Sequence, residues 1–97
     1  MAYSIFIKDE EELENRIKSK DKNLSIEIVK VILDNLDTEK RFINILEIHL
    51  ENSGLIIDIT ADRKNFAYTL EKNLDTLIFH EEYEICSQVK NALEYLS

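Results

Sequence analysis

This chain almost lacks the residues that interrupt regular structure: its 97 residues include one glycine and no proline. Turns that need a positive φ or a proline ring must therefore be rare, and the connections between helices and strands should be short. The same scarcity excludes glycine-rich phosphate-binding loops. At this length we expect a single domain, 1–97, with a modest core.

Three segments show the alternation of apolar and other residues that is typical of β-strands: 2–7, 42–50 and 55–60. Four residues that end in Gly54 separate the last two, which predicts a hairpin. In the middle segment we expect one face to carry Phe42, Asn44, Leu46, Ile48 and Leu50. In the last segment we expect Leu55, Ile57 and Ile59 to face the core. The three segments predict a small antiparallel sheet.

Four further segments are predicted to be helical: 9–20, 25–36, 62–80 and 82–96. The first begins with acids and ends with bases, as the helix dipole favours, and Asp9 is its expected N-cap with Glu12 three residues later. The region 24–36 also fits a strand, because its first residues alternate; we favour a helix. The last two segments should form an antiparallel hairpin, 62–97, which completes an α+β domain.

The formal net charge of −8 argues against binding nucleic acid by phosphate neutralisation, and it favours solubility or a basic partner. The single cysteine, Cys86, cannot form an internal disulfide, which predicts a reducing compartment. We find no signal-peptide pattern and no apolar run near the ~20 residues of a membrane span, so we expect a cytoplasmic location. The Ile-, Lys- and Asn-rich composition fits a bacterium or phage with an AT-rich genome.

Few residues suggest catalysis or metal binding. Glu47, His49 and Asp58 could meet on one sheet face as an acid–base group or as metal ligands, although an ordinary polar sheet face explains them better. His80 could bind a metal with a glutamate one turn later, but a position at a helix C-terminus explains it better. Cys86 lies among glutamates that disfavour a thiolate, so we expect a packing residue. We therefore expect no enzyme activity, no metal and no cofactor.

The last third of the chain carries a pattern of its own. Spaced leucines lead into the turn Glu81-Glu82-Tyr83-Glu84, followed by the small pair Cys86-Ser87 and by Val89, Leu93 and Leu96. Residues 70–97 resemble the UVR motif, the small helical hairpin of nucleotide-excision-repair proteins, Clp-family ATPases and their adaptors. Members of that family usually have an Arg-Asp pair in the second helix, where this chain has Lys90-Asn91. The resemblance implies protein–protein association through the hairpin, often self-association, and no catalysis.

We therefore expect a non-enzymatic protein–protein interaction module, a small acidic adaptor or regulator that acts through its C-terminal hairpin. The expected contact residues are Tyr83, Glu81, Glu82, Glu84, Tyr95, Glu10 and Glu11. The alternative is an acidic inhibitor, of the immunity or phage anti-defence type, that binds a basic effector or, as an oligomer, a small ligand. A homodimer is expected, formed by sheet-edge pairing or by a four-helix bundle of hairpins.

Overall fold

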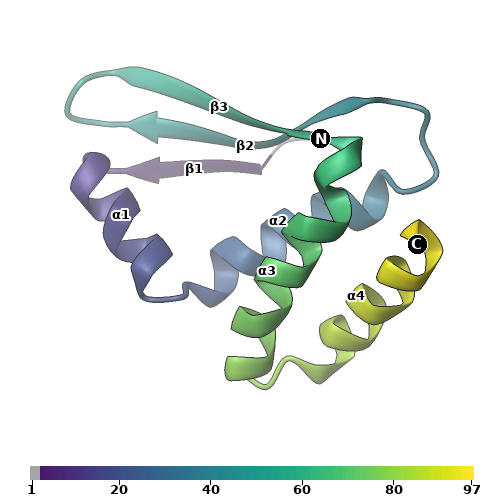
Figure 1. Ribbon diagram of the computed structural model, residues 1–97. Helices are drawn as coiled ribbons and strands as arrows, with labels where there is room; N and C mark the ends of the chain where they lie inside the picture. The colour runs from purple at the N-terminus through teal and green to yellow at the C-terminus, as the bar shows by residue number, and fades with distance from the viewer. Residues whose placement is uncertain (1–2) are drawn as a thin grey trace.

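The computed structural model describes residues 3–97, which form a three-stranded sheet and four α-helices (Figure 1). The elements are β1 Tyr3–Ile7, α1 Glu10–Lys18, α2 Lys22–Asp34, β2 Phe42–Leu50, β3 Leu55–Asp62, the 3-10 turn η1 Arg63–Asn65, α3 Phe66–Phe79 and α4 Tyr83–Leu96. Every predicted helix and strand is present, and the ambiguous region 24–36 lies largely in helix α2. The α+β class is therefore confirmed. Residue 2 of the first predicted strand lies outside the described residues.

The sheet is mixed rather than purely antiparallel. β2 and β3 form the antiparallel hairpin that the turn at Gly54 predicted, whereas β1 pairs parallel with β2, from Tyr3 beside Leu46 to Ile7 beside Leu50. The prediction of an antiparallel sheet is therefore wrong for β1. The physical reason is that α1 and α2 lie between the two strands in the sequence, and a helical crossover returns the chain in the same direction.

A β-bulge in β2, between Asn44 and Leu46, changes which residues face the helices. Before the bulge Ile43 is buried while Phe42 and Asn44 are exposed; after it Leu46, Ile48 and Leu50 are buried. The predicted single face of β2 is therefore wrong for its first two members. The extra residue, Ile45, reverses the alternation, since one inserted residue moves the following side chains to the other face.

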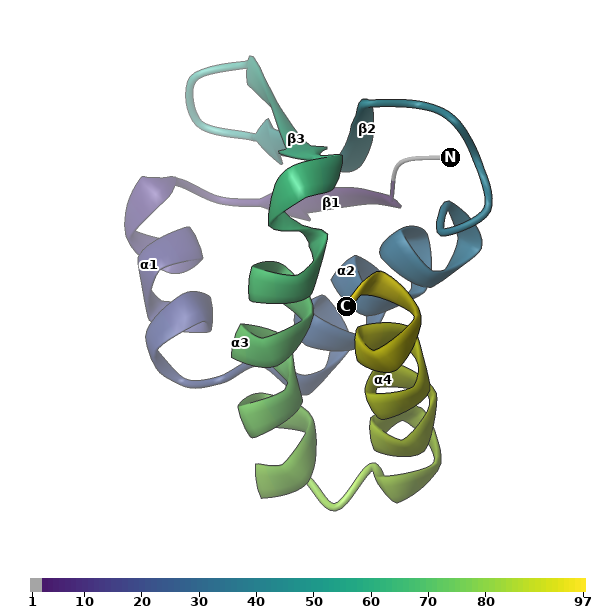
Figure 2. The ribbon, with the colours of Figure 1, turned by 45° about the vertical axis from the view of Figure 1, so that its right-hand side comes forward.

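The helices all lie on one side of the sheet, as Figures 1 and 2 show. α2 contacts β1, β2, α3 and α4, while α3 and α4 pack against each other as the predicted hairpin. Between these layers lies one core, whose fully buried members include Ile7, Ile32, Ile48, Phe66, Leu70 and Leu77.

The helix starts follow from side-chain caps. Asp9 accepts a hydrogen bond from the Glu12 amide at 3.0 Å, as predicted for α1. Asp21 accepts one from the Leu24 amide at 3.0 Å, which makes α2 begin three residues earlier than predicted. Helix α3 begins later than predicted, because β3 continues to Asp62 and η1 follows it.

Candidate functional site

The turn between α3 and α4 is held in place by the connection between α1 and α2. Glu81 adopts a φ of 59° in this turn, a left-handed conformation that non-glycine residues seldom take. His80 Nε2 donates to the Lys20 carbonyl oxygen at 2.6 Å, and the Glu82 carboxylate pairs with the Lys22 ammonium at 3.1 Å. Two segments far apart in the sequence are thus tied together, which gives the turn a defined shape.

Large apolar side chains surround this turn and remain exposed to solvent. Phe79 is 65 % exposed, Tyr83 is 64 % exposed, and the neighbouring Ile78 is exposed as well. The Phe79 ring meets the His80 ring edge-on, with centroids 5.0 Å apart, and the Lys20 ammonium lies 5.3 Å from the Phe79 centroid. We name the group Ile78, Phe79, Glu81, Tyr83 and Glu84 the hairpin tip.

The predicted contact residues lie in three separate places. Four of them, Glu81, Glu82, Tyr83 and Glu84, are at the α3–α4 turn, although Glu82 is engaged in its ion pair. Tyr95 is exposed near the other end of α4, about 18 Å from Tyr83 at the usual helical rise. Glu10 and Glu11 are in the first turn of α1, near the sheet (Figure 1). No single surface therefore joins all of the predicted contact residues within residues 3–97.

Sequence reasoning did not assign Ile78 or Phe79 to a contact surface. Apolar residues at helical spacing form a stripe along residues 66–78 that includes both Leu77 and Ile78, but in the structure Leu77 is buried and Ile78 is exposed. Phe79 lies two residues after the buried Leu77, and residues two apart in a helix point to nearly opposite sides. That offset from the stripe was the available signal for an exposed aromatic residue.

A second candidate site lies between the start of α1 and the β2–β3 turn. It is a cleft of about 360 Å³ lined by Asp9, Glu10, Glu11, Leu50, Asn52, Ser53 and Leu55. One wall carries the acids of α1, and the apolar part comes from Leu50 and Leu55. Such a cleft suits a lysine or arginine side chain, whose stem is apolar and whose end is charged.

The predicted group of Glu47, His49 and Asp58 lies on the face of the sheet away from the helices. His49 Nε2 donates to Glu47 Oε1 at 2.7 Å, and the Phe6 ring stacks on the imidazole with centroids 4.4 Å apart. Asp58 is the cross-strand neighbour of Glu47. Within residues 3–97 no three His, Cys, Asp or Glu side chains are placed to hold a metal ion.

The other two candidates have structural positions. His80 is the C-terminal cap residue of α3, as the sequence favoured, and its ring is bound to the Lys20 carbonyl group. Cys86 is buried on α4, as expected of a packing residue.

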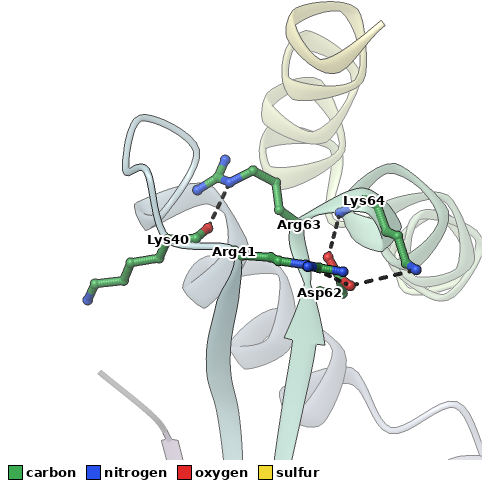
Figure 3. A network of polar contacts seen from close by, with 5 residues as sticks. All are labelled: Lys40, Arg41, Asp62, Arg63 and Lys64. Atoms are coloured by element: carbon green, nitrogen blue, oxygen red, sulfur yellow. Dashed lines mark hydrogen bonds and ion pairs between the residues drawn. The ribbon is translucent and has the colours of Figure 1, made fainter.

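A basic cluster that the sequence did not reveal surrounds the end of β3 (Figure 3). The Arg63 guanidinium donates to the carbonyl oxygens of Asn35, Leu36 and Lys40 and to Thr38 Oγ1, at distances between 2.8 and 3.1 Å. Asp62 pairs with Arg41 at 3.6 Å and with Lys64 at 3.8 Å. Arg63 therefore acts as a clamp that fixes the α2–β2 connection.

Comparisons with protein-family models, with curated proteins and with solved structures gave no match for this chain. The resemblance of residues 70–97 to the UVR motif therefore stays a prediction. Among residues 3–97, no helix has both the length and the apolar character that crossing a membrane requires.

Proposed function

We propose that this protein is a non-enzymatic protein-binding module, an adaptor or regulator, whose contact surface is the hairpin tip. The observation that carries the proposal is the exposure of Phe79 and Tyr83, two aromatic side chains on one braced turn. Aromatic residues dominate binding energy at protein interfaces, because they bury a large area at a small cost in side-chain entropy.

The contacts that hold the turn in place support a role of Phe79 and Tyr83 in binding a partner rather than in packing within the chain. The His80 bond to Lys20 and the Glu82 pair with Lys22 fix the backbone on which Phe79 and Tyr83 stand. A surface that is already ordered loses little entropy on association, so more of the contact energy appears as affinity.

The charge of the hairpin tip indicates the kind of partner. Glu81 and Glu84 are exposed beside Phe79 and Tyr83, while the third acid of the turn, Glu82, is paired with a lysine. A complementary partner therefore offers an apolar pocket with basic residues at its rim. The resemblance of residues 70–97 to the UVR motif supports the same reading.

The test compares captures by three forms of the full chain from a lysate of the source cells: wild type, Phe79→Ser with Tyr83→Ser, and Tyr68→Ser as a control. Tyr68 is equally exposed but lies on α3 away from the turn. We expect one protein to bind directly to wild type and to the control, with at least tenfold loss in the double variant. A partner that binds all three equally, or binding that needs only Tyr68, contradicts the proposal.

A second candidate function, the acidic inhibitor, is favoured by the cleft beside α1. Its acidic wall, with Glu10 and Glu11 exposed, would receive a lysine or arginine of a basic effector. Charge steering makes association with such a target fall steeply as salt rises. The expected signature is a slower association rate in Glu10→Gln with Glu11→Gln, but not in Glu71→Gln with Glu94→Gln, which removes the same charge elsewhere. An association rate that changes neither with salt nor in the Glu10→Gln, Glu11→Gln variant contradicts this function. The alternative in which an oligomer binds a small ligand stays a prediction.

A further inference from the structure

Strand β3 exposes apolar side chains on both of its faces. On the side that faces the helices, Leu50 is buried, whereas its cross-strand neighbour Leu55 is 57 % exposed. Likewise Leu46 is buried and its neighbour Ile59 is 38 % exposed. On the opposite side Ile56 is 58 % exposed. The prediction that the whole inner row of β3 faces the core is therefore wrong for its outermost positions.

The placement of the helices explains this exposure. The helix contacts of the sheet are concentrated on β1, which meets α1 and α2, and on β2, which meets α2. In sheet order β3 comes after β2, so it lies beyond the strands that the helices cover. The apolar side chains of β3 that point toward the helices are therefore less covered than those of β1 and β2.

The free edge of β3 has little of the usual protection against strand pairing, since its only charged residues are Asp58 and Asp62. Its eight residues, Leu55–Asp62, include no lysine, arginine or proline, and the bulge of this hairpin lies in β2 instead. Natural edge strands are normally shortened, charged with lysine, interrupted by proline or bulged. The other edge strand, β1, has five residues and buries both Ile5 and Ile7. Strand β3 is thus the edge that is open to a further strand.

We infer that β3 is a self-association site, at which two copies of this chain pair their β3 strands antiparallel about a two-fold axis. The pairing joins two sheets into one and covers Ile59, and it places each free edge against an identical one. This surface is separate from the hairpin tip, which lies at the far end of α3 from the sheet (Figure 2), so the inference does not rest on the proposed function.

Charge favours the strand edge over the open face of the sheet as the contact. On the open face Glu47 and Asp58 are direct cross-strand neighbours, so stacking two such faces would bring the carboxylates of both copies together. Edge pairing leaves this face in water. Each copy also carries a net charge of −8, so two copies repel each other. Self-association is therefore favoured only where the carboxylates of the two copies stay apart.

Repulsion between carboxylates also limits the register in which two β3 strands can pair. In an antiparallel pair, residues that lie opposite each other point to the same face of the sheet. When a two-fold axis relates two identical strands, this requires one residue to lie opposite its own copy, and the axis passes between those two residues. An axis at Asp58 would set the two Asp58 side chains against each other. An axis at Thr60 would set Asp58 against Asp62 of the second copy. Both registers oppose carboxylates and are unfavourable.

The two remaining central registers differ in what Asp58 meets. An axis at Ile57 would place each Asp58 carboxylate against the apolar Ile56 of the second copy. An axis at Ile59 places the two Ile59 side chains together and sets each Asp58 opposite a Thr60 hydroxyl, which can donate to it. This axis also sets Asp62 opposite Ile56, but the Asp62 carboxylate already pairs with Arg41 and Lys64 of its own chain, whereas Asp58 has no such partner among the ion pairs of residues 3–97. We therefore assign the two-fold axis to Ile59.

The expected interface is small. A single strand edge offers less than the ~800 Å² per partner of a standard stable interface. The dimer should therefore dissociate on dilution, and sedimentation equilibrium of the full chain from micromolar to millimolar concentration is the appropriate measurement. The expected result is a reversible monomer–dimer equilibrium. A wild-type chain that stays monomeric up to millimolar concentration overturns the inference.

The register is tested by opposite charges at one exposed position. Thr60→Lys should tighten the dimer roughly tenfold, because each lysine faces Asp58 of the second copy, and Thr60→Asp should weaken it by a similar factor. The matched control is Ser87→Lys and Ser87→Asp, which change the net charge equally on the exposed face of α4. If the substitutions at Thr60 and at Ser87 change the dimer affinity equally, net charge alone explains the effect and the assigned contact is overturned.

A covalent test is independent of charge. In a Cys86→Ala background, mild oxidation should link two copies of Ile59→Cys, since paired strands bring facing Cα atoms within the reach of a disulfide. Copies of Asp58→Cys should link far less, because the assigned register separates these two positions. Preferential linking of Asp58→Cys overturns the register. Absence of linking by either variant, at concentrations where wild type is dimeric, overturns the β3 interface itself.

Discussion

The layer of α2, α3 and α4 and the strand β3 use their apolar residues in opposite ways. In the helical layer Phe66, Leu70 and Leu77 are fully buried, and Val89 on α4 packs into the same core. On β3, by contrast, Leu55, Ile56 and Ile59 all keep contact with solvent. An apolar stripe therefore indicates an interface only when the chain's own fold leaves the stripe uncovered. Here the inner faces of the helices cover one another, whereas the sheet runs beyond the helices.

Truncating a core side chain in the helical layer should destabilise the protein most. Leu77→Ala should lower the free energy of unfolding by about 2–5 kcal/mol, because it leaves a cavity in a closed core. The neighbouring Ile78→Ala, at an exposed position, should cost under about 1 kcal/mol. Urea denaturation of both variants measures the contrast. Equal losses would mean that the two faces of α3 are not distinct.

The second effect concerns the clamp that ties the end of α2 to the start of β2. Arg63→Met removes the donor to three backbone carbonyls, and we expect a loss of about 2–3 kcal/mol in denaturant unfolding. Lys64→Met is the control, since the Lys64 side chain is exposed and its ion pair with Asp62 is long, so the pair should contribute less than about 0.5 kcal/mol. If Arg63→Met lowers the free energy of unfolding no more than Lys64→Met does, the connection between α2 and β2 is stable without the Arg63 hydrogen bonds.

A third, smaller effect compares the caps of two helices. Asp21→Ala should cost about 1 kcal/mol, because α2 is packed against both the sheet and the other helices. Asp9→Ala should cost less in global unfolding, since α1, which the structure describes completely, buries none of its residues. Fraying of α1 should then appear as faster amide exchange instead. The opposite ranking would place α1 inside the cooperative core.

A substitution on the exposed outer side of β3 should have the least effect on stability. Ile56→Thr should change the free energy of unfolding by less than about 0.5 kcal/mol when measured at concentrations where the chain is monomeric. The threonine keeps the β-branched shape that a strand favours. A loss above that range would show that something within the monomer already covers this side of β3.

The helices were predictable from the sequence because their apolar spacing reflects burial directly. Phe66, Leu70 and Leu77 follow one helical stripe, and each is buried where the stripe places it. Helix caps were readable for the same reason, since a cap such as Asp9 is a local interaction within a few residues.

The sheet was less predictable because its geometry depends on distant segments. Neither the parallel pairing of β1 nor the bulge at Ile45 leaves a mark in local alternation. Leu55 and Ile59 have the spacing of core residues, but whether a helix lies beneath them is decided by the placement of α1 and α2.

The candidate site was predicted in part. Tyr83 is exposed at the turn as expected, whereas Glu82 is paired with Lys22 from another helix, a contact that sequence spacing cannot show. The role of Arg63 was missed for the same reason, since its acceptors are backbone carbonyls rather than side chains with a recognisable pattern.

The parallel pairing of β1 has a consequence for the order in which the molecule forms. The β2–β3 and α3–α4 hairpins close through short turns, whereas β1 meets β2 only after nearly half of the chain has been brought together. Closing so long a loop lowers the entropy of the chain before the contacts between β1 and β2 form, and this slows folding. Strand β1 should therefore join late, onto a hairpin that is already formed, and it is the part of the sheet whose formation limits the folding rate.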